Sequence, residues 1–194
     1  CTIAEREKRM YYDITQEVFS CKVYPGDTPP SFRRAQDMAR GDACTVTDIT
    51  MCAHNGTHVD APAHYVRGGK TAEELELYRF AGRCAVRSFA GRICAEELQN
   101  ITAPRLLIKG EREITPEEAA LLGEKFLLVG VETQSVGPDE AHRVLLGKGV
   151  ALLEGVRLSG IAEGEYELFA FPLKLGGCDG APVRAVLRTK EEKE

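Results

Sequence analysis

Three of the four histidines lie within one eleven-residue segment, residues 54–64, which has the sequence HNGTHVDAPAH and is called the histidine segment below. The segment also contains Asp60. Histidine is the commonest metal ligand and titrates near neutral pH, so this cluster indicates a metal site or a proton-transfer site. The fourth histidine, His142, is distant in sequence, and we expect the fold to return it to this segment.

The segment supplies a ligand set that is typical of a catalytic metal site. His54 and His58 offer two imidazoles and Asp60 offers a carboxylate, which leaves one position open for water. Three protein ligands with an open position are typical of catalytic Zn²⁺, and nitrogen and oxygen donors without sulfur also suit Mn²⁺. Asp60 has a second oxygen for another ion, and we expect His142 and Glu154 to complete that second site.

His64 has two candidate roles, a further metal ligand or a free base. A metal lowers the pKa of its bound water towards neutrality, and an imidazole that is not a ligand can carry the released proton. This chemistry favours the free base. A single histidine is more often a hydrogen-bonded core residue, but three histidines beside an aspartate favour a metal site.

Short strands and short helices alternate along the chain. The residue pattern predicts strands over residues 11–15, 44–51, 84–89, 105–109, 126–131, 150–153, 166–173 and 181–188. It predicts helices over residues 71–78 and 115–123, a third helix from residue 138 to Gly147 or Gly149, and a helical turn over 95–100. This alternation indicates an α/β fold with a mixed β-sheet and short flanking helices. We expect a single domain over residues 10–189, with terminal tails at 1–9 and 190–194.

A few residues should fix local structure. Thr71 with Glu74, and Thr115 with Glu118, fit capping boxes at the N-termini of two helices. Within the histidine segment, Pro62 argues against one continuous helix. The segment is therefore predicted to be irregular and tight, directly after a strand.

Composition excludes several classes of protein. The chain has 194 residues and a formal net charge of −5, and its dispersed basic residues argue against a nucleic-acid partner. No apolar run approaches the roughly 20 residues that span a bilayer. The seven cysteines are odd in number and include no CxxC pair. Together with a charged N-terminus that lacks a signal-peptide pattern, they predict a cytoplasmic protein with reduced thiols, several of them in the core.

The histidine segment resembles the signature of the metal-dependent cyclase family, which includes the bacterial kynurenine formamidases. The matching pattern is His54-x-Gly56-Thr57-His58-x-Asp60-x-Pro62-x-His64. Weaker matches occur in the family's order at residues 25–29, 132–135, 142–146 with Glu154, and 178–184. The similarity begins near Tyr11 and covers most of the chain.

This resemblance implies a swivelling β/β/α fold and a site with two metal ions, usually zinc. The matching positions imply one ion held by His54, His58 and Asp60. They imply a second ion held by Asp60, His142 and Glu154. The resemblance assigns His64 as the general acid/base. It also implies a homodimer or homotetramer in which the N-terminal region of one subunit lies near the site of another.

The resemblance further implies an amidohydrolase that converts N-formylkynurenine to kynurenine and formate. Tyr24 stands where the formamidases usually have tryptophan, and its ring can still stack on an aryl substrate. Two alternatives remain beside this reading. One is the same metal site acting on a cyclic amide of the isatin type or on a lactone. The other is a non-enzymatic module that binds a metal or a small ligand.

Overall fold

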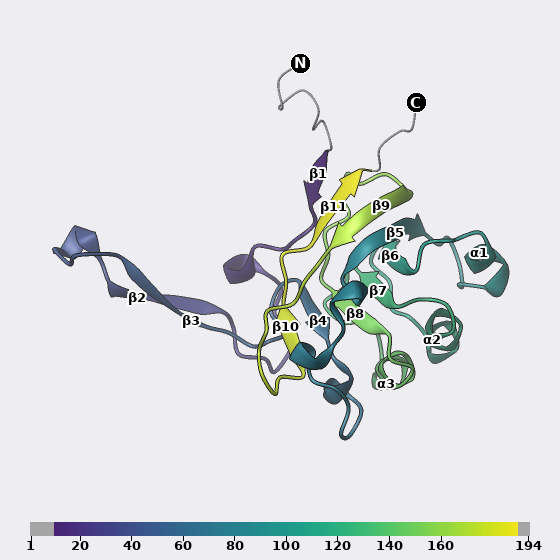
Figure 1. Cartoon of the computed structure of the whole chain (residues 1–194), viewed down its shortest axis with the longest axis horizontal. Helices are drawn as coiled ribbons and strands as arrows, with labels where there is room; N and C mark the ends of the chain where they lie inside the picture. The colour runs from purple at the N-terminus through teal and green to yellow at the C-terminus, as the bar shows by residue number, and fades with distance from the viewer. Residues whose placement is uncertain (1–9, 190–194) are drawn as a thin grey trace, which may run out of the picture.

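A nine-stranded mixed β-sheet forms the centre of the computed structural model, which describes residues 10–189 (Figure 1). Its strands are β1 (Tyr11–Asp13), β4 (His58–Asp60), β5 (Ala81–Ser88), β6 (Arg105–Lys109), β7 (Leu128–Val131), β8 (Ala151–Glu154), β9 (Gly164–Phe169), β10 (Gly180–Pro182) and β11 (Val186–Thr189). They lie in the order β1-β11-β9-β5-β6-β7-β8-β4-β10. The predicted α/β fold with a mixed sheet is confirmed, whereas the proposed tails lie outside the described residues.

The middle of the sheet is parallel and carries the helices. Strands β5, β6, β7 and β8 run parallel, and the connections between them contain α1 (Ala95–Gln99), α2 (Pro116–Gly123) and α3 (Asp139–Gly147). All three helices lie on one side of the sheet (Figure 1). Buried side chains of these strands and helices, including Leu106, Leu152, Leu122 and Leu145, form one core cluster.

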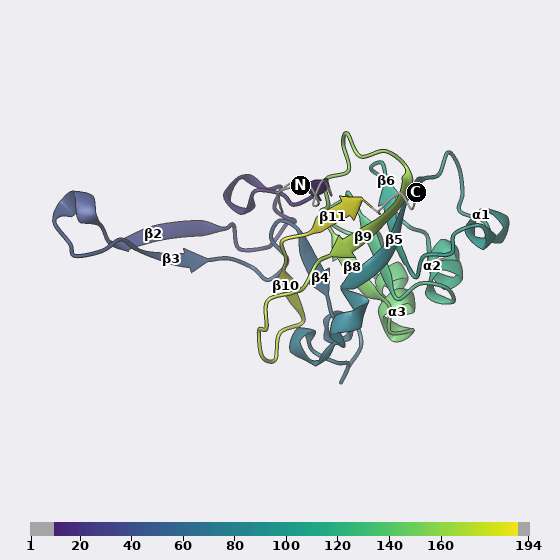
Figure 2. The same ribbon diagram turned by 45° about the horizontal axis from the view of Figure 1, so that its top comes forward.

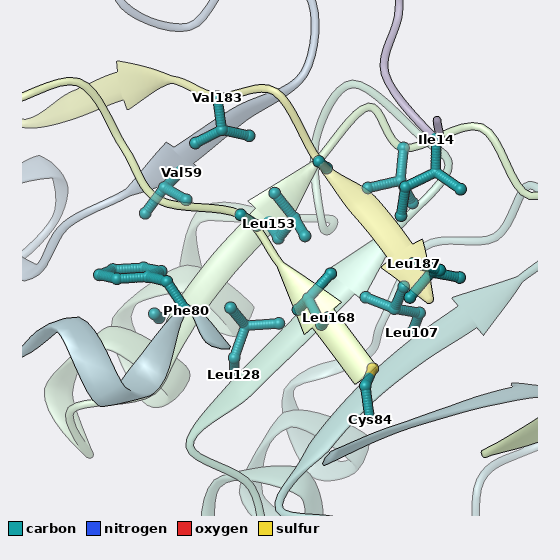
Figure 3. Close-up of a cluster of buried hydrophobic side chains, with 14 of the residues drawn as sticks. Ile14, Val59, Phe80, Cys84, Leu107, Leu128, Leu153, Leu168, Val183 and Leu187 are labelled. Carbon is teal, nitrogen blue, oxygen red and sulfur yellow. The ribbon is translucent and has the colours of Figure 1, made fainter. Parts of the chain in front are cut away.

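A second core cluster occupies the opposite face of the sheet (Figure 3). Leu107 and Leu153 belong to it, although Leu106 and Leu152 beside them belong to the first cluster, because successive side chains of a strand point to opposite faces. Val59 of β4 also contributes, as do residues of β9 and β11 from the other end of the sheet. The sheet therefore curls round this second cluster.

The two predicted capping boxes have different outcomes. At the start of α2, Glu118 accepts a hydrogen bond from the Thr115 backbone N–H (2.9 Å), and the predicted helix is present. The Thr71 backbone N–H likewise donates to Glu74 (2.9 Å), but only the two 3₁₀ turns Ala72–Glu74 and Leu77–Arg79 follow. The predicted helix over residues 71–78 is wrong, because buried Leu75 has an extended backbone that interrupts it.

The C-terminal strand prediction also needs correction. Residues 181–188 were expected to form one strand, but the structure divides them between β10 and β11. Strand β10 pairs with β4, whereas β11 pairs with β9 and β1 near the other end of the sheet. The chain therefore crosses the curled sheet between these two strands, and β10 reaches the histidine segment.

A two-stranded arm projects away from the main sheet (Figures 1 and 2). It consists of β2 (Ser31–Gln36) and β3 (Val46–Thr50), which pair antiparallel with each other. The strand expected over residues 44–51 is thus present as β3, but it lies outside the main sheet, and β2 was not predicted. Every residue of the two strands is exposed, including the opposed pair Phe32 and Ile49.

The cysteine prediction is confirmed only in part. Six cysteines fall within residues 10–189, and all six are free. Only Cys84 is buried in the core, whereas Cys44 is exposed and the others are partly exposed, so the expectation of several core cysteines is wrong. Within the same part of the chain, no helix is long and apolar enough to cross a membrane.

Candidate metal centre

Strand β4 places two residues of the histidine segment on one face of the sheet. His58 and Asp60 are two positions apart, so their side chains point the same way, while Val59 between them points into the core. The segment is therefore more regular than predicted. It begins with a turn at Gly56, whose φ of 68° suits glycine, and ends in the 3₁₀ turn Pro62–His64.

The neighbouring strand and helix α3 complete a buried cluster. The register of β4 and β8 sets His58 opposite Glu154, and the His58 Nε2 atom lies 3.3 Å from a Glu154 oxygen and 3.4 Å from an Asp60 oxygen. His142, in the first turn of α3, brings its Nε2 atom to 3.3 Å from Glu154 and 3.8 Å from Asp60. None of the four residues is more than 3% exposed.

His54 and His64 lie beside this cluster and are less buried than its four members. Their rings stack with centroids 4.2 Å apart. The His54 Nδ1 atom lies 2.9 Å from an Asp60 oxygen, which joins it to the buried group. The structure thus brings together all six residues that the sequence nominated as metal ligands or acid/base.

Asp179 was not nominated from the sequence, although it lies within the matched residues 178–184. One oxygen of its carboxylate accepts hydrogen bonds from His54 Nε2 (3.0 Å) and His64 Nδ1 (2.9 Å). The next residue, Gly180, pairs with Asp60 across β10 and β4. A Cβ atom at Gly180 would lie 2.7 Å from the His54 ring, so glycine makes room for that imidazole. The Asp-Gly pair in the matched segment was the available signal.

Gln134 is a second residue that sequence reasoning missed. Its side-chain amide donates to the backbone oxygens of His54 (3.0 Å) and Gly56 (2.8 Å), and its oxygen accepts from Gln16 (3.0 Å). In the same loop, the backbone N–H of Val136 donates to Glu154 (2.6 Å). The loop after β7 therefore holds the turn of the histidine segment and orients one carboxylate of the cluster.

The cluster opens into a cavity of about 150 Å³, called the site cavity below. Tyr24 and Asp27 line it from the N-terminal loop, and Gln134 and Ser135 line it from the loop after β7. Tyr65 forms part of the wall and stacks on His142 with ring centroids 4.5 Å apart. The predicted substrate residue Tyr24 thus lies at the cavity, where 52% of its surface is exposed.

The donor set fits a divalent cation. One oxygen of Asp60, Oδ2, is buried and has no hydrogen-bond partner, which is costly unless a cation or a proton compensates it. His58, Asp60 and Glu154 offer ligand atoms within 4.8 Å of one another, and so do His54, Asp60 and His64. Asp60 belongs to both groups, as a carboxylate between two ions would. The second group keeps both candidate roles of His64 open.

The same carboxylates hold protons on the histidines. Burial by itself lowers the pKa of His58, but Asp60 and Glu154 outweigh it and raise this pKa to about 10. Burial also lowers the pKa of His142 and of His54. Glu154 outweighs this effect at His142 and Asp60 outweighs it at His54, so both pKa values are raised. Burial would raise the pKa of Asp60, yet hydrogen bonds from His54 and His58 hold it well below its usual range. Protons and metal therefore compete for the same nitrogens.

This competition predicts opposite pH effects on two forms of the protein. Because the folded pKa of His58 lies above the unfolded value of 6.5, protonated His58 stabilises the fold below pH 6.5, and this stabilisation is lost as the pH rises towards 10. We expect the Tm of chelator-treated protein to fall between pH 6.5 and 9.5. The rise in Tm on adding Zn²⁺ should grow over the same interval, as scanning calorimetry would show. A Zn²⁺-induced rise that shrinks with pH would contradict this prediction.

Solved structures of similar fold include metal-dependent hydrolases. The chain is 27% identical to a potential metal-dependent hydrolase with cyclase activity, with a TM-score of 0.78 and coverage of 94% of this chain and 99% of that one. A predicted metal-dependent hydrolase from Bacillus stearothermophilus matches with 27% identity, a TM-score of 0.77 and the same coverage. Isatin hydrolase A from Labrenzia aggregata, bound to benzyl benzoate, has 22% identity, a TM-score of 0.78 and coverage of 97% and 96%, a likeness of fold alone.

A family model gives the assignment. The model of the Cyclase family, described as "Putative cyclase", matches residues 12–125, which is more than half of the chain. This range contains the whole histidine segment, and the fold adds His142 and Glu154 to it from outside the range. With the hydrolase neighbours, the buried donor set supports a hydrolase that uses a divalent metal. The chain belongs to the Cyclase family, as its histidine segment predicted.

Proposed function

We propose that this protein is a metal-dependent amidohydrolase that hydrolyses N-formylkynurenine to kynurenine and formate. One observation carries the proposal: a buried cluster of histidine, aspartate and glutamate side chains that fits a divalent cation lies directly beside His64, whose Nδ1 is held by Asp179 and whose ring faces the site cavity. Hydrolysis of an amide needs activated water and a proton for the leaving nitrogen. Metal ligands and a positioned imidazole at the same cavity could supply both. A module that only binds metal has no use for the held imidazole.

We propose two Zn²⁺ ions for this site, with Mn²⁺ as the other cation that suits the donors. The first ion would be held by His54, His58 and Asp60. The second would be held by Asp60, His142 and Glu154. The buried Oδ2 atom of Asp60, which lacks a hydrogen-bond partner, supports a shared ligand. Bound metal would supply Lewis acidity, which activates water and stabilises negative charge on the amide oxygen.

The residues of the chain would supply positioning and proton transfer. In the reaction the formyl C–N bond breaks, the hydroxyl of water goes to the formyl carbon, and a proton goes to the aniline nitrogen. Asp179 accepts from His64 Nδ1, which leaves Nε2 of that ring to carry the proton. Tyr24 at the cavity mouth would stack on the aryl ring.

The test is kinetics on N-formylkynurenine, isatin and a lactone, with metal analysis of the same sample. We expect the highest kcat/KM on N-formylkynurenine, and we expect a chelator to remove metal and activity together. A higher kcat/KM on isatin would transfer the assignment to cyclic amides. Metal-loaded protein that is inactive on all three would contradict the amidohydrolase and favour a binding module.

Hydrolysis of a cyclic amide is the second candidate. Its support is the fold likeness to isatin hydrolases, one of them solved with the product analogue thioisatinate at 16% identity and a TM-score of 0.81. The same bond chemistry would apply, since isatin contains an aryl amide within its ring. The two candidate substrates differ beyond the amide, because N-formylkynurenine carries an α-amino acid group and isatin does not.

We also propose that the protein is a homo-oligomer, a dimer or a tetramer, in which the arm of one subunit packs on another. An isolated two-stranded ribbon is only marginally stable in water, and this arm exposes apolar side chains such as Phe32 (53%) and Ile49 (59%). A second copy of the chain is the partner that is always present at matching concentration. The arm leads into the histidine segment, which would connect assembly to the site.

Charged substitutions on the arm should separate the subunits. We expect the double variant Phe32→Asp with Ile49→Asp to elute as a monomer in size-exclusion chromatography with light scattering, because burying two carboxylates in the interface is unfavourable. The matched variant Phe32→Leu with Ile49→Val keeps the apolar character and should remain oligomeric. Monomeric wild-type protein, or an oligomer that is unchanged by both charges, would contradict the proposal.

A further inference from the structure

A second cavity, of about 320 Å³, adjoins the site cavity and is called the outer cavity below. Tyr24, Gln134 and Ser135 line both cavities, so the two meet at these side chains. The site cavity alone is smaller than the roughly 300–1,000 Å³ of typical small-molecule sites, whereas both together fall within that range. A substrate larger than its reacting amide would therefore extend into the outer cavity.

The outer cavity is lined by charged side chains of both signs. Lys22 and Arg157 supply two cations, and Glu111 and Glu113 supply two carboxylates. For none of these four side chains does the structure show an ion pair or hydrogen bond within residues 10–189. A third carboxylate, that of Glu132, is already engaged, because its oxygens accept from the backbone N–H groups of two other residues. The four unpaired groups are therefore available to a ligand.

This mixture of charges selects a particular kind of ligand. Unpaired cations alone would favour a carboxylate, and an arginine binds one with paired hydrogen bonds. Unpaired carboxylates alone would favour an ammonium group. Charges of both signs lining one cavity favour a ligand that carries a carboxylate and an ammonium group together.

We propose that the outer cavity binds the zwitterionic α-amino acid group of the substrate. Lys22 and Arg157 would receive its carboxylate, and Glu111 and Glu113 its ammonium group. The aryl ring would lie at Tyr24, between the two cavities, and the amide in the site cavity. The inference rests on the proposed function and deepens it, because N-formylkynurenine carries such a group beyond its aryl ring and isatin does not. The outer cavity is thus what would separate the two candidate substrates.

The kinetic test uses three formamides that differ only in the tail. They are N-formylkynurenine, its analogue without the α-amino group, and N-formyl-2-aminoacetophenone, which has neither charge. For Lys22→Ala with Arg157→Ala, we expect kcat/KM to fall roughly 10- to 100-fold on the first two formamides, mainly through KM. For Glu111→Gln with Glu113→Gln, a loss is expected on the first formamide only. The uncharged formamide should be unaffected in both variants, and the exposed control Arg92→Ala should leave all three unchanged.

A binding measurement keeps this inference separate from catalysis. Kynurenine retains the amino acid group, so its Kd by titration calorimetry should rise by a similar factor in both double variants. Losses that are equal on all three formamides, or a kynurenine Kd unchanged in the Lys22 and Arg157 variant, would overturn the inference while leaving the proposed function intact. Charge-dependent kynurenine binding by a protein that hydrolyses none of the formamides would support the inference and overturn the proposed function.

Discussion

Replacing His64 with alanine is expected to lower kcat for the formamide by about 10²- to 10⁴-fold, the range found for removal of a general acid/base. The metal content of the variant should equal that of the wild type. The reason is geometric: His64 is held through Nδ1 by Asp179 at the edge of the cavity and lies outside the buried group formed with Glu154. Stopped assays for kynurenine, with metal analysis of the same sample, would measure both quantities.

Two further variants would sharpen this result. Asp179→Asn keeps the shape of the side chain but removes the charge that holds both His64 and His54. A smaller fall in kcat is expected, with metal retained because Asp60 still holds His54. Tyr65→Phe keeps the ring that packs against His64 and His142 and removes only the hydroxyl, which donates to Asp139, so this variant should remain close to wild type. Loss of metal from His64→Ala would show that His64 is a ligand, the role that its proximity to His54 and Asp60 keeps open.

The histidine segment was the most predictable part of the site, because its information is local. The alternation of His58 and Asp60 around Val59 is already the pattern of a strand with one polar and one apolar face. Proline and glycine within the segment nevertheless favoured an irregular conformation. The segment nevertheless forms strand β4 because β8 and β10 pair with it on either side. A strand of three residues has little conformational preference of its own.

Asp179 and Gln134 could not be assigned roles from the sequence because their contacts depend on register. Asp179 reaches His54 and His64 only because β10 pairs with β4, more than a hundred residues earlier in the chain. Gln134 binds backbone oxygens, which carry no residue-specific signal. His142 and Glu154 were nominated because histidines are scarce and strand ends are common sites, and the fold confirmed that both reach the cluster.

The arm marks another limit of sequence reasoning. The β-branched residues of β3 predict a strand, but a pattern of this kind does not say which sheet the strand joins. Its partner β2 carries Arg33, Arg34 and Gln36 and lacks a clear apolar face. Only the three-dimensional structure shows that β2 and β3 together project away from the main sheet (Figure 2). The same applies to the outer cavity, whose charged residues come from four separate segments.

Asp60→Asn is expected to have the largest effect on metal binding of any single substitution. Asp60 belongs to both candidate ligand groups, so the neutral amide would weaken every proposed ion at once, whereas a change at His142 would affect one. We expect no stoichiometric Zn²⁺ after dialysis and no measurable hydrolysis. The rise in Tm that saturating Zn²⁺ gives the wild type should disappear, because a ligand stabilises only the form that binds it.

Buried carboxylates also affect stability without metal, so this variant needs a matched control. Glu118 is equally buried (1% exposed), but its ion pair is with Arg112, which is not a candidate metal ligand, so Glu118→Gln should lower Tm while leaving Zn²⁺ binding unchanged. In Asp60→Asn the pKa of His58 should fall below its wild-type value of about 10, because one of the two carboxylates that raise it is gone. An NMR titration of the imidazole signals would show this directly. Asp60→Asn that still binds Zn²⁺ like the wild type would mean that Asp60 is not the shared ligand, and the cluster would then have to hold its cation through His58, His142 and Glu154.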